Sequence, residues 1–282
     1  MNKLKDLDAI MGIHAEMQDI VDVCEKPYRN KETGNFSDFA RGRASLAEKV
    51  AVMNAIELAK NTGVKMHIVH ATIPETIDMI WRAKQEGYPV STETCPHYLI
   101  RNLEDLDKKE IGAFGVCIPP LRLKEDVEGL WERISKGQID FVGSDHATYT
   151  FEEKDTTDIW NTYFGTTSIQ TMIPLIYDGM MKRGMSRQAF AALVSCNAAK
   201  RYRLRNKGYI GCGYDADLFF INPKDSWTVN DDELKYKMKW SIYGGMKLQG
   251  RIVSTMVRGK LVYHRGEIVQ KPGYGKFIKP VK

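Results

Sequence analysis

Short apolar runs alternate with longer helical patterns over the first two thirds of the chain. "IMGIHAE", "VKMHIVHAT", "PVSTETCPHYL" and "IDFVGSDHA" are short runs rich in β-branched and other apolar residues. Between them lie longer segments such as "SLAEKVAVMNAIELAKNTG", "PETIDMIWRAKQEG" and "KEDVEGLWERISKG". The short runs are typical of strands and the longer ones of helices. Strands and helices that alternate in this order predict an α/β fold with parallel strands and crossover helices.

Turn-forming residues support the limits of these helices. Gly63 is expected to end the first long helix, and Pro74 and Gly87 to mark the first turn and the end of the next one. Two more helices are expected over residues 166–183 and 186–200. The expected apolar face of the first long helix comprises Ala47, Val50, Ala51, Asn54, Ile56 and Leu58.

The pattern changes after about residue 205. "KGYIGCGYDADLFFINP" and "GRIVSTMVRGKLVYHRGEIV" are short runs interrupted by Gly and Asp, and the last of them have no helix between them. This pattern predicts a small antiparallel β domain. We therefore expect an α/β domain over residues 1–205, and a β domain with an extended C-terminal tail over residues 206–282.

Composition and charge narrow the class of protein. The chain has 43% hydrophobic and 27% charged residues, as in ordinary globular proteins. Its apolar runs are far shorter than the roughly 20 residues of a membrane span, and no leader-like segment opens it. The five scattered cysteines form no Cys-x-x-C pair, which favours reduced thiols. The net charge of +5 is spread along the chain. We therefore expect a cytoplasmic protein with neither nucleic acid nor a membrane as its partner.

Three candidate metal ligands each follow a predicted strand. His14, His70 and Asp145 lie at the C-terminal ends of three of the β-branched runs. In a (β/α) barrel these ends form one rim, where active sites are built. Neutral imidazoles and carboxylates are usual ligands of catalytic divalent metals. A single strand-end histidine is more often structural. His67, three residues before His70, is expected to pack on the opposite face, and His264 to lie on the surface.

Taken together, the motifs resemble the cyclic amidohydrolases. "GIHAE", "HIVHAT", "STETCPHYL", "CIPPLR", "VGSDHATYTFEEK", "NAAKRYRL", "KGYIGCGYDADLFFI", "STMVRGKLVYHRGEIV" and "KPGYGKFIKP" occur in this order. This family includes dihydropyrimidinase/hydantoinase, allantoinase and dihydroorotase. The C-terminal segment most resembles the dihydropyrimidinase/hydantoinase branch. The resemblance implies a TIM-like (β/α) barrel and a β-sandwich.

The resemblance also implies a role for each candidate residue. His14 and His70 match two histidine ligands of a two-metal site, usually zinc, and Asp145 matches the aspartate that binds metal and transfers the proton. The substrate's imide or ureido edge is expected on Cys117, Ile118, Pro119 and, with poorer alignment, Asn161. His97 and His146 are expected to orient ligands, although a purely structural role is equally compatible with the sequence.

Two family features have no counterpart here. The family site needs a His-x-His pair and a carboxylated lysine upstream of the position of His14, and the sequence contains no His-x-His. We therefore expect the C-terminal half of a barrel followed by part of a β-sandwich, an N-terminally truncated chain that is inactive alone. Met17 stands where the family often has Asn, and a thioether does not reproduce the hydrogen bonds of an amide.

The leading hypothesis is a metal-dependent hydrolase that opens a cyclic amide or ureide in the manner of dihydropyrimidinase/hydantoinase. Allantoinase or dihydroorotase activity is the alternative among enzymes, and a non-catalytic scaffold of the same fold is the alternative outside them. By analogy with the family, we expect a homo-oligomer when the protein is complete.

Overall fold

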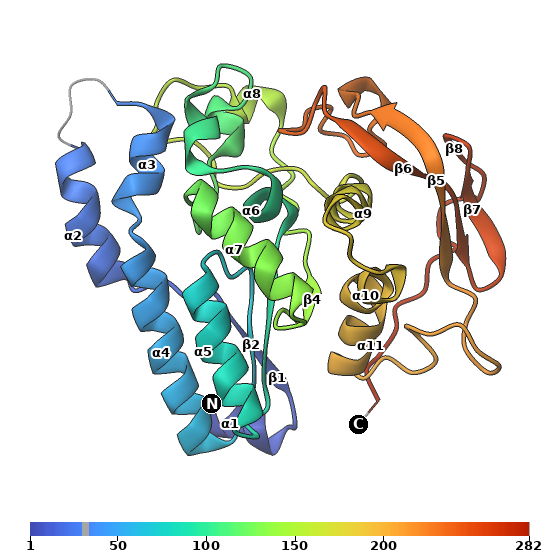
Figure 1. Cartoon of the computed structure of the whole chain (residues 1–282), viewed down its shortest axis with the longest axis horizontal. Helices are drawn as coiled ribbons and strands as arrows, with labels where there is room; N and C mark the ends of the chain where they lie inside the picture. The colour runs from blue at the N-terminus through green and yellow to red at the C-terminus, as the bar shows by residue number, and fades with distance from the viewer. Residues whose placement is uncertain (30–33, 282) are drawn as a thin grey trace. The chain divides into compact units, whose positions relative to one another are not determined.

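The structure is a computed structural model that describes residues 1–29 and 34–281 (Figure 1). It divides into two compact units. The first unit comprises Met1–Gln170 and Asn230–Gly244, and the second comprises Thr171–Val229 and Gly245–Lys282. The division expected at residue 205 was based on a change from alternating helices and strands to strands alone. The two units are instead defined by which residues contact one another. That division stays a prediction.

The first unit is built on a parallel sheet of β1 (Ile10–Ile13), β2 (Lys65–Ile68), β3 (Val90–Thr94) and β4 (Phe141–Val142). The strands lie in chain order, β1-β2-β3-β4, and every neighbouring pair is parallel. Their C-terminal ends therefore share one edge of the sheet. This agrees with the predicted α/β alternation, while the partial barrel stays a prediction.

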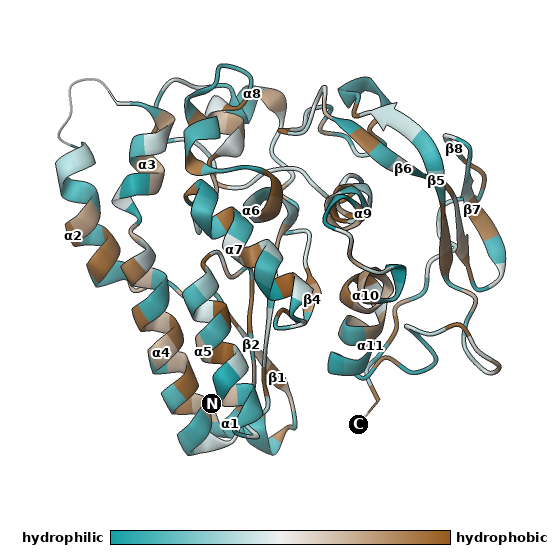
Figure 2. Ribbon diagram, viewed as in Figure 1, coloured by the Kyte–Doolittle hydropathy of each residue, from teal (hydrophilic) through white to brown (hydrophobic). Residues whose placement is uncertain are grey.

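Helices connect these strands. α1 (Asn2–Asp6) precedes β1, and α2 (Gln18–Arg29), α3 (Phe36–Gly42) and α4 (Ser45–Thr62) lie between β1 and β2. α5 (Pro74–Gln85) leads to β3, followed by α6 (Pro96–Ile100), η1 (Leu103–Asp107), η2 (Gly112–Gly115) and α7 (Lys124–Ser135). α8 (Phe151–Lys154) follows β4, and η4 (Asp231–Glu233) completes the unit. α5 packs between α4 and α7, and the ribbons of α5 and α7 mix hydrophobic and hydrophilic residues (Figure 2).

The local turn predictions hold, but the predicted face of α4 is only partly buried. α4 ends at Gly63 in the left-handed conformation (φ 71°), and Pro74 occupies the first turn of α5. The buried residues of α4 are Ala47, Glu48, Val52, Ala55, Ile56 and Ala59. Leu58 is 53% exposed. Of the predicted face, Ala47 and Ile56 are buried. Apolar periodicity does not reveal Glu48, because its carboxylate is a charged group on the packed face.

The helix expected from residue 166 begins at residue 172. Residues 166–168 instead carry buried hydroxyl side chains, and the hydroxyls of Thr167 and Ser168 donate to backbone carbonyls of the first unit. Thr167 Oγ1 donates to the carbonyl of Trp240 at 2.6 Å, and Thr166 pairs with His146 in an isolated bridge. These tertiary bonds hold the segment extended, which helical periodicity does not reveal.

The second unit combines helices with an antiparallel sheet. α9 (Met172–Lys182), α10 (Arg187–Ala191), a π-helical turn η3 (Ala192–Cys196) and α11 (Asn197–Arg201) precede β5 (Leu218–Thr228), β6 (Lys247–Val257), β7 (Lys260–His264) and β8 (Glu267–Ile268). The sheet order is β5-β6-β7-β8. Gly250 (φ 90°) lets β6 approach α9 closely, because a Cβ there would lie 2.5 Å from Cδ1 of Tyr177. The small antiparallel β sheet was predicted; its origin in a sandwich stays a prediction.

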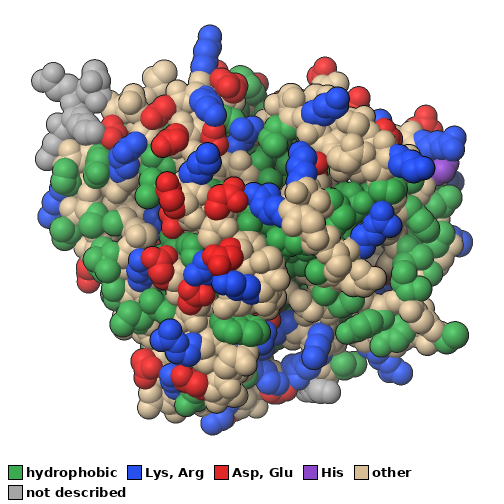
Figure 3. Space-filling view, in the orientation of Figure 1, with side chains coloured by type: hydrophobic (Ala, Val, Ile, Leu, Met, Phe, Trp, Pro, Cys, Tyr) green, Lys and Arg blue, Asp and Glu red, His purple; other side chains and the backbone are tan. Residues whose placement is uncertain are grey.

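Charged side chains of both signs lie among one another on the face drawn in Figure 3. Among the helices of the described residues, none is long and apolar enough to cross a bilayer.

Candidate functional site

Each strand of the parallel sheet is followed by a residue with metal-binding chemistry. His14 follows β1, His70 follows β2, Cys95 and His97 follow β3, and Asp145 follows β4. Because parallel strands end at the same edge, these side chains come from one edge of the first unit. His70 (φ 40°) and Asp145 (φ 43°) adopt the left-handed backbone conformation, which is uncommon outside glycine.

The imidazoles of His14 and His70 are in direct contact. His14 Nδ1 lies 3.1 Å from His70 Nε2, and the ring centroids are 4.8 Å apart at an interplanar angle of 71°. The strand-end positions predicted this convergence across 56 residues of sequence. Two facing ring nitrogens share one proton at most in this contact, so at least one of them presents a lone pair.

Glu16 and Arg43 hold the other side of the His14 ring. His14 Nε2 lies 3.1 Å from Glu16 Oε2, and Arg43 donates to the same oxygen at 3.1 Å and to Glu25 Oε1 at 3.0 Å. Burial opposes the charge on Glu16, but its hydrogen bonds to His14 and Arg43 outweigh burial and lower the pKa of the carboxyl. Sequence reasoning missed both partners. The only hint of one of them was the glutamate in "GIHAE".

His70 is buried, and its Nδ1 has no hydrogen-bond partner among the described residues. Burial lowers the pKa of His70, while the nearby charge of Asp145 acts in the opposite direction. The ring is therefore held neutral at pH 7, which is the form that binds metal.

Glu48 fixes the backbone immediately after His70. Its buried carboxylate accepts from the Thr72 backbone at 3.0 Å and from Thr76 Oγ1 at 2.8 Å, and it pairs with Arg122 at 3.4 Å. The "PPLR" arginine thus joins α4 to the end of β2. This network is structural support for the edge that carries His70.

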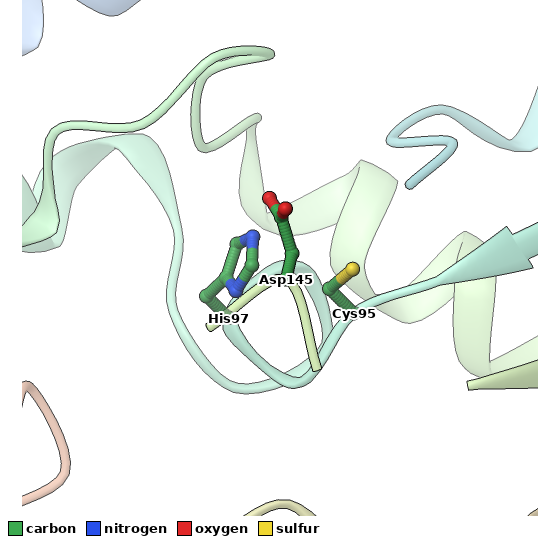
Figure 4. Close-up of side chains that lie close together, drawn as sticks. All are labelled: Cys95, His97 and Asp145. Atoms are coloured by element: carbon green, nitrogen blue, oxygen red, sulfur yellow. The ribbon is translucent and has the colours of Figure 1, made fainter. Parts of the chain in front are cut away.

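Cys95, His97 and Asp145 form a second cluster (Figure 4). One ligand atom from each lies within 4.8 Å of the other two. Cys95 and His97 are fully buried, whereas Asp145 is exposed. Neither nitrogen of His97 has a hydrogen-bond partner in the part of the chain that the structure describes. Burial and the neighbouring charge of His70 lower the pKa of His97 to about 3.

The expected substrate-holding segment lies beside this edge. Burial raises the pKa of the Cys117 thiol to about 12, and the charge of Asp145 acts in the same direction. Pro119 is buried, and its carbonyl accepts from the Tyr98 hydroxyl at 2.7 Å. Ile118 between them is partly exposed. The Pro119 carbonyl thus ties this segment to α6.

The structure does not bring Asn161 to the histidine pair. Its side-chain amide donates to Asp158 Oδ2 at 2.8 Å, and its backbone N–H donates to Oδ1 at 3.2 Å. Both bonds lie within its own exposed loop. A role in substrate binding stays a prediction for this residue.

His146 and His67 are engaged in packing. His146 Nδ1 accepts from the Ser168 backbone at 3.0 Å, and its ring meets Tyr236 edge-on at 4.9 Å. His67 is buried and stacks on Phe141 at 4.8 Å, as expected of a packing residue. His264, in the second unit, is exposed as predicted.

Lys154 is a buried lysine that the sequence did not mark as a site residue. Its Nζ donates to the carbonyls of Tyr163 at 2.6 Å and Val116 at 3.1 Å. Burial lowers the pKa of this amine to about 7. Val116 directly precedes Cys117, so Lys154 ties the loop after β4 to the expected substrate-holding segment.

The donor set fits a divalent metal of the zinc type. The ligands would be the nitrogens of two imidazoles in contact, one of which has no hydrogen-bond partner among residues 1–29 and 34–281, and an exposed carboxylate oxygen. His14, His70 and Asp145 are the residues that would hold the ion.

Comparison with known proteins gives a consistent set of relatives. A model described as "Amidohydrolase family" matches residues 1–262. Allantoinase of Rubrobacter xylanophilus is 35% identical over 269 residues, which are 95% of this chain and 59% of that protein. Allantoinase of Bacillus licheniformis is 35% identical over 280 residues, 99% of this chain and 61% of that protein. The chain thus spans about three fifths of the length of these relatives.

Solved structures agree at the level of fold. L-Hydantoinase (dihydropyrimidinase) from Arthrobacter aurescens superposes with a TM-score of 0.94 at 26% identity, covering 99% of this chain and 62% of that one. Dihydropyrimidinase from Brevibacillus agri gives 0.87 at 28% identity, covering 94% and 59%.

Proposed function

The chain belongs to the amidohydrolase family, and from this membership we propose that it carries part of the active site of a metal-dependent hydrolase of cyclic amides. The observation that supports the proposal most is the contact between His14 and His70, with the charge of Asp145 acting on the same ring. Three residues from three strand ends supply two imidazoles and one carboxylate.

His14, His70 and Asp145 hold a divalent cation, for which zinc is the best fit to the donor atoms. When bound, such a cation polarises a carbonyl oxygen and lowers the pKa of water. The ligand role of His14 depends on Glu16 and Arg43, which orient its ring. His146 accepts a hydrogen bond from the Ser168 backbone and supports the segment that carries Asp145.

Asp145 also moves the proton. Its carboxylate is exposed, so a substrate and water reach it directly. It takes a proton from the attacking water and delivers it to the nitrogen of the amide bond that breaks. The backbone groups of Cys117 and Ile118, and Asn161 if its loop approaches, bind the imide or ureido edge of the ring. Lys154 keeps that segment in place.

The substrate is a cyclic ureide or imide. The relatives at 35% identity are named allantoinases, and the structural neighbours are named hydantoinases or dihydropyrimidinases. We take allantoin as the first substrate to assay and hydantoin and dihydrouracil as the next. Ring opening of dihydroorotate alone would refute this choice. A scaffold without catalysis predicts no bound zinc and no turnover of any of the four.

The experiment is zinc binding by the purified chain, measured by equilibrium dialysis and elemental analysis. In a parent chain that carries Cys95→Ser, we expect His14→Ala, His70→Ala and Asp145→Asn each to weaken zinc binding by more than about tenfold. His264→Ala, in the second unit, is the control and is expected to bind like the parent chain. Equal zinc binding by all four variants would refute the proposed centre.

A further inference from the structure

The Cys95 cluster contains a ligand set that the proposed hydrolytic centre does not use. We infer that Cys95, His97 and Asp145 form a separate site for a thiophilic divalent cation, of the Cd²⁺ or Zn²⁺ type. Only Asp145 is common to both sites. The inference concerns binding by these three side chains and does not depend on the protein being a hydrolase.

The distances between the three ligand atoms allow them to bind one cation after a small movement of their side chains. The three ligand atoms lie within 4.8 Å of one another and come from two adjacent strand ends, β3 and β4 (Figure 4). Tetrahedral zinc with sulfur, nitrogen and oxygen ligands places those atoms about 3.4–3.6 Å apart. The ligand atoms therefore need to approach one another by at most about 1.4 Å. Changes of side-chain torsion provide that range without moving the strands.

The second, independent observation is His97. Its ring is completely buried, yet neither nitrogen has a hydrogen-bond partner in the residues that the structure describes. Buried polar groups in proteins are nearly always bonded, because an unsatisfied one is costly. A cation bound to one nitrogen removes part of that cost. Both nitrogens of His97 are thus available to a cation, unlike Nδ1 of the buried His67, which bonds to Ser91.

The chemistry of the donors selects the class of cation. A thiolate and an imidazole favour soft or borderline metals over Mg²⁺ and Ca²⁺, which prefer oxygen. The exposed carboxylate of Asp145 gives the ion a route from solvent to the buried sulfur. Binding replaces the thiol proton of Cys95 by the metal and releases that proton to solvent. If the proposed hydrolytic centre exists, an ion held here also withdraws Asp145 from the histidine pair.

The test is a titration of the purified chain with Cd²⁺, followed by the ultraviolet charge-transfer absorption of a thiolate–cadmium bond. The parent for all variants carries Cys212→Ser, which removes an exposed thiol. We expect absorption that saturates at one cadmium per chain, accompanied by release of one proton. Cys95→Ser should abolish it. Cys117→Ser, a matched change at the neighbouring buried thiol, should retain it.

Two further variants keep the test decisive if Cys95→Ser misfolds. His97→Gln and Asp145→Asn should each weaken cadmium binding by more than about tenfold while leaving the thiol present. The double variant His14→Ala/His70→Ala should retain the absorption, which separates this site from the proposed hydrolytic centre. Absorption that survives Cys95→Ser, or affinity unchanged in both His97→Gln and Asp145→Asn, would overturn the inference. Loss of absorption in the double histidine variant would overturn it as well.

Discussion

Replacing Lys154 by Met should change how stability depends on pH. Lys154 is completely buried, and its amine has two carbonyl acceptors and a pKa of about 7 instead of the usual 10.5. The unfolded chain keeps the usual value, so between pH 7 and 10.5 it binds more protons at this lysine than the folded chain does. Stability therefore rises with pH in that window.

The size of the effect follows from the two pKa values. At pH 7, keeping the amine in its buried site costs about 4 kcal/mol, and at pH 9 the cost has fallen to about 2 kcal/mol. Lys154 should thus add about 2 kcal/mol to the free energy of unfolding between pH 7 and 9. Burial of Cys95 and Cys117 raises their thiol pKa values, which acts in the opposite direction as the pH rises. That contribution is common to the parent chain and the variant and cancels in their difference.

Urea unfolding of the parent chain and of Lys154→Met at pH 7 and 9 measures this difference. Hydrogen bonds lost in the variant shift its stability at both pH values equally, so the change between them isolates the titration. We expect the parent to gain about 2 kcal/mol relative to Lys154→Met. Lys124→Met removes an exposed lysine charge and should follow the parent. Parallel pH profiles for the parent and Lys154→Met would show that the amine stays charged in the folded chain.

Three other variants test separate features. The pKa of His97 is about 3 instead of 6.5. The folded chain should therefore lose about 3 kcal/mol of stability when the pH falls from 6.5 to 4. In urea unfolding at acid pH, His97→Gln should lack this loss, and the control His264→Gln should keep it. Gly250→Ala should destabilise the second unit by about 3 kcal/mol in thermal unfolding, because the new Cβ overlaps the Tyr177 ring and the backbone is left-handed. Gly259→Ala should cost about 1 kcal/mol, because the backbone there is also left-handed (φ 78°) but the space is open. Equal losses in the two variants would show that the overlap does not matter. Glu48→Gln should lower the free energy of unfolding in urea by about 3 kcal/mol, because it leaves the buried guanidinium of Arg122 without its counter-charge. A loss below about 1 kcal/mol would show that this ion pair does not stabilise the fold.

Local patterns in the sequence predicted much of the first unit. Gly63 and Pro74 limit helices through their own backbone preferences, so their effect is visible without tertiary information. The segment over residues 166–171 and the buried face of α4 were not predictable in this way. Thr167 and Glu48 are polar residues whose partners lie far away in sequence, and only the folded chain shows that they are buried.

Part of the candidate site was also predictable from the sequence. His14 and His70 were placed at one edge because parallel strands end together, and the structure brings their rings into contact. Glu16, Arg43 and Lys154 were missed, since a charged residue is more often solvated than buried. Their positions depend on pairing and burial that no local pattern encodes. The roles of the ligands stay predictions.

Because His70 and Asp145 have a left-handed backbone, selection for stability and selection for chemistry favour different residues at these two positions. A side chain held in that conformation costs on the order of 1 kcal/mol, and glycine would remove the cost. Variants screened only for heat resistance should therefore accumulate glycine at both places. Variants screened for chemistry should keep the imidazole and the carboxylate and recover the deficit elsewhere in the fold.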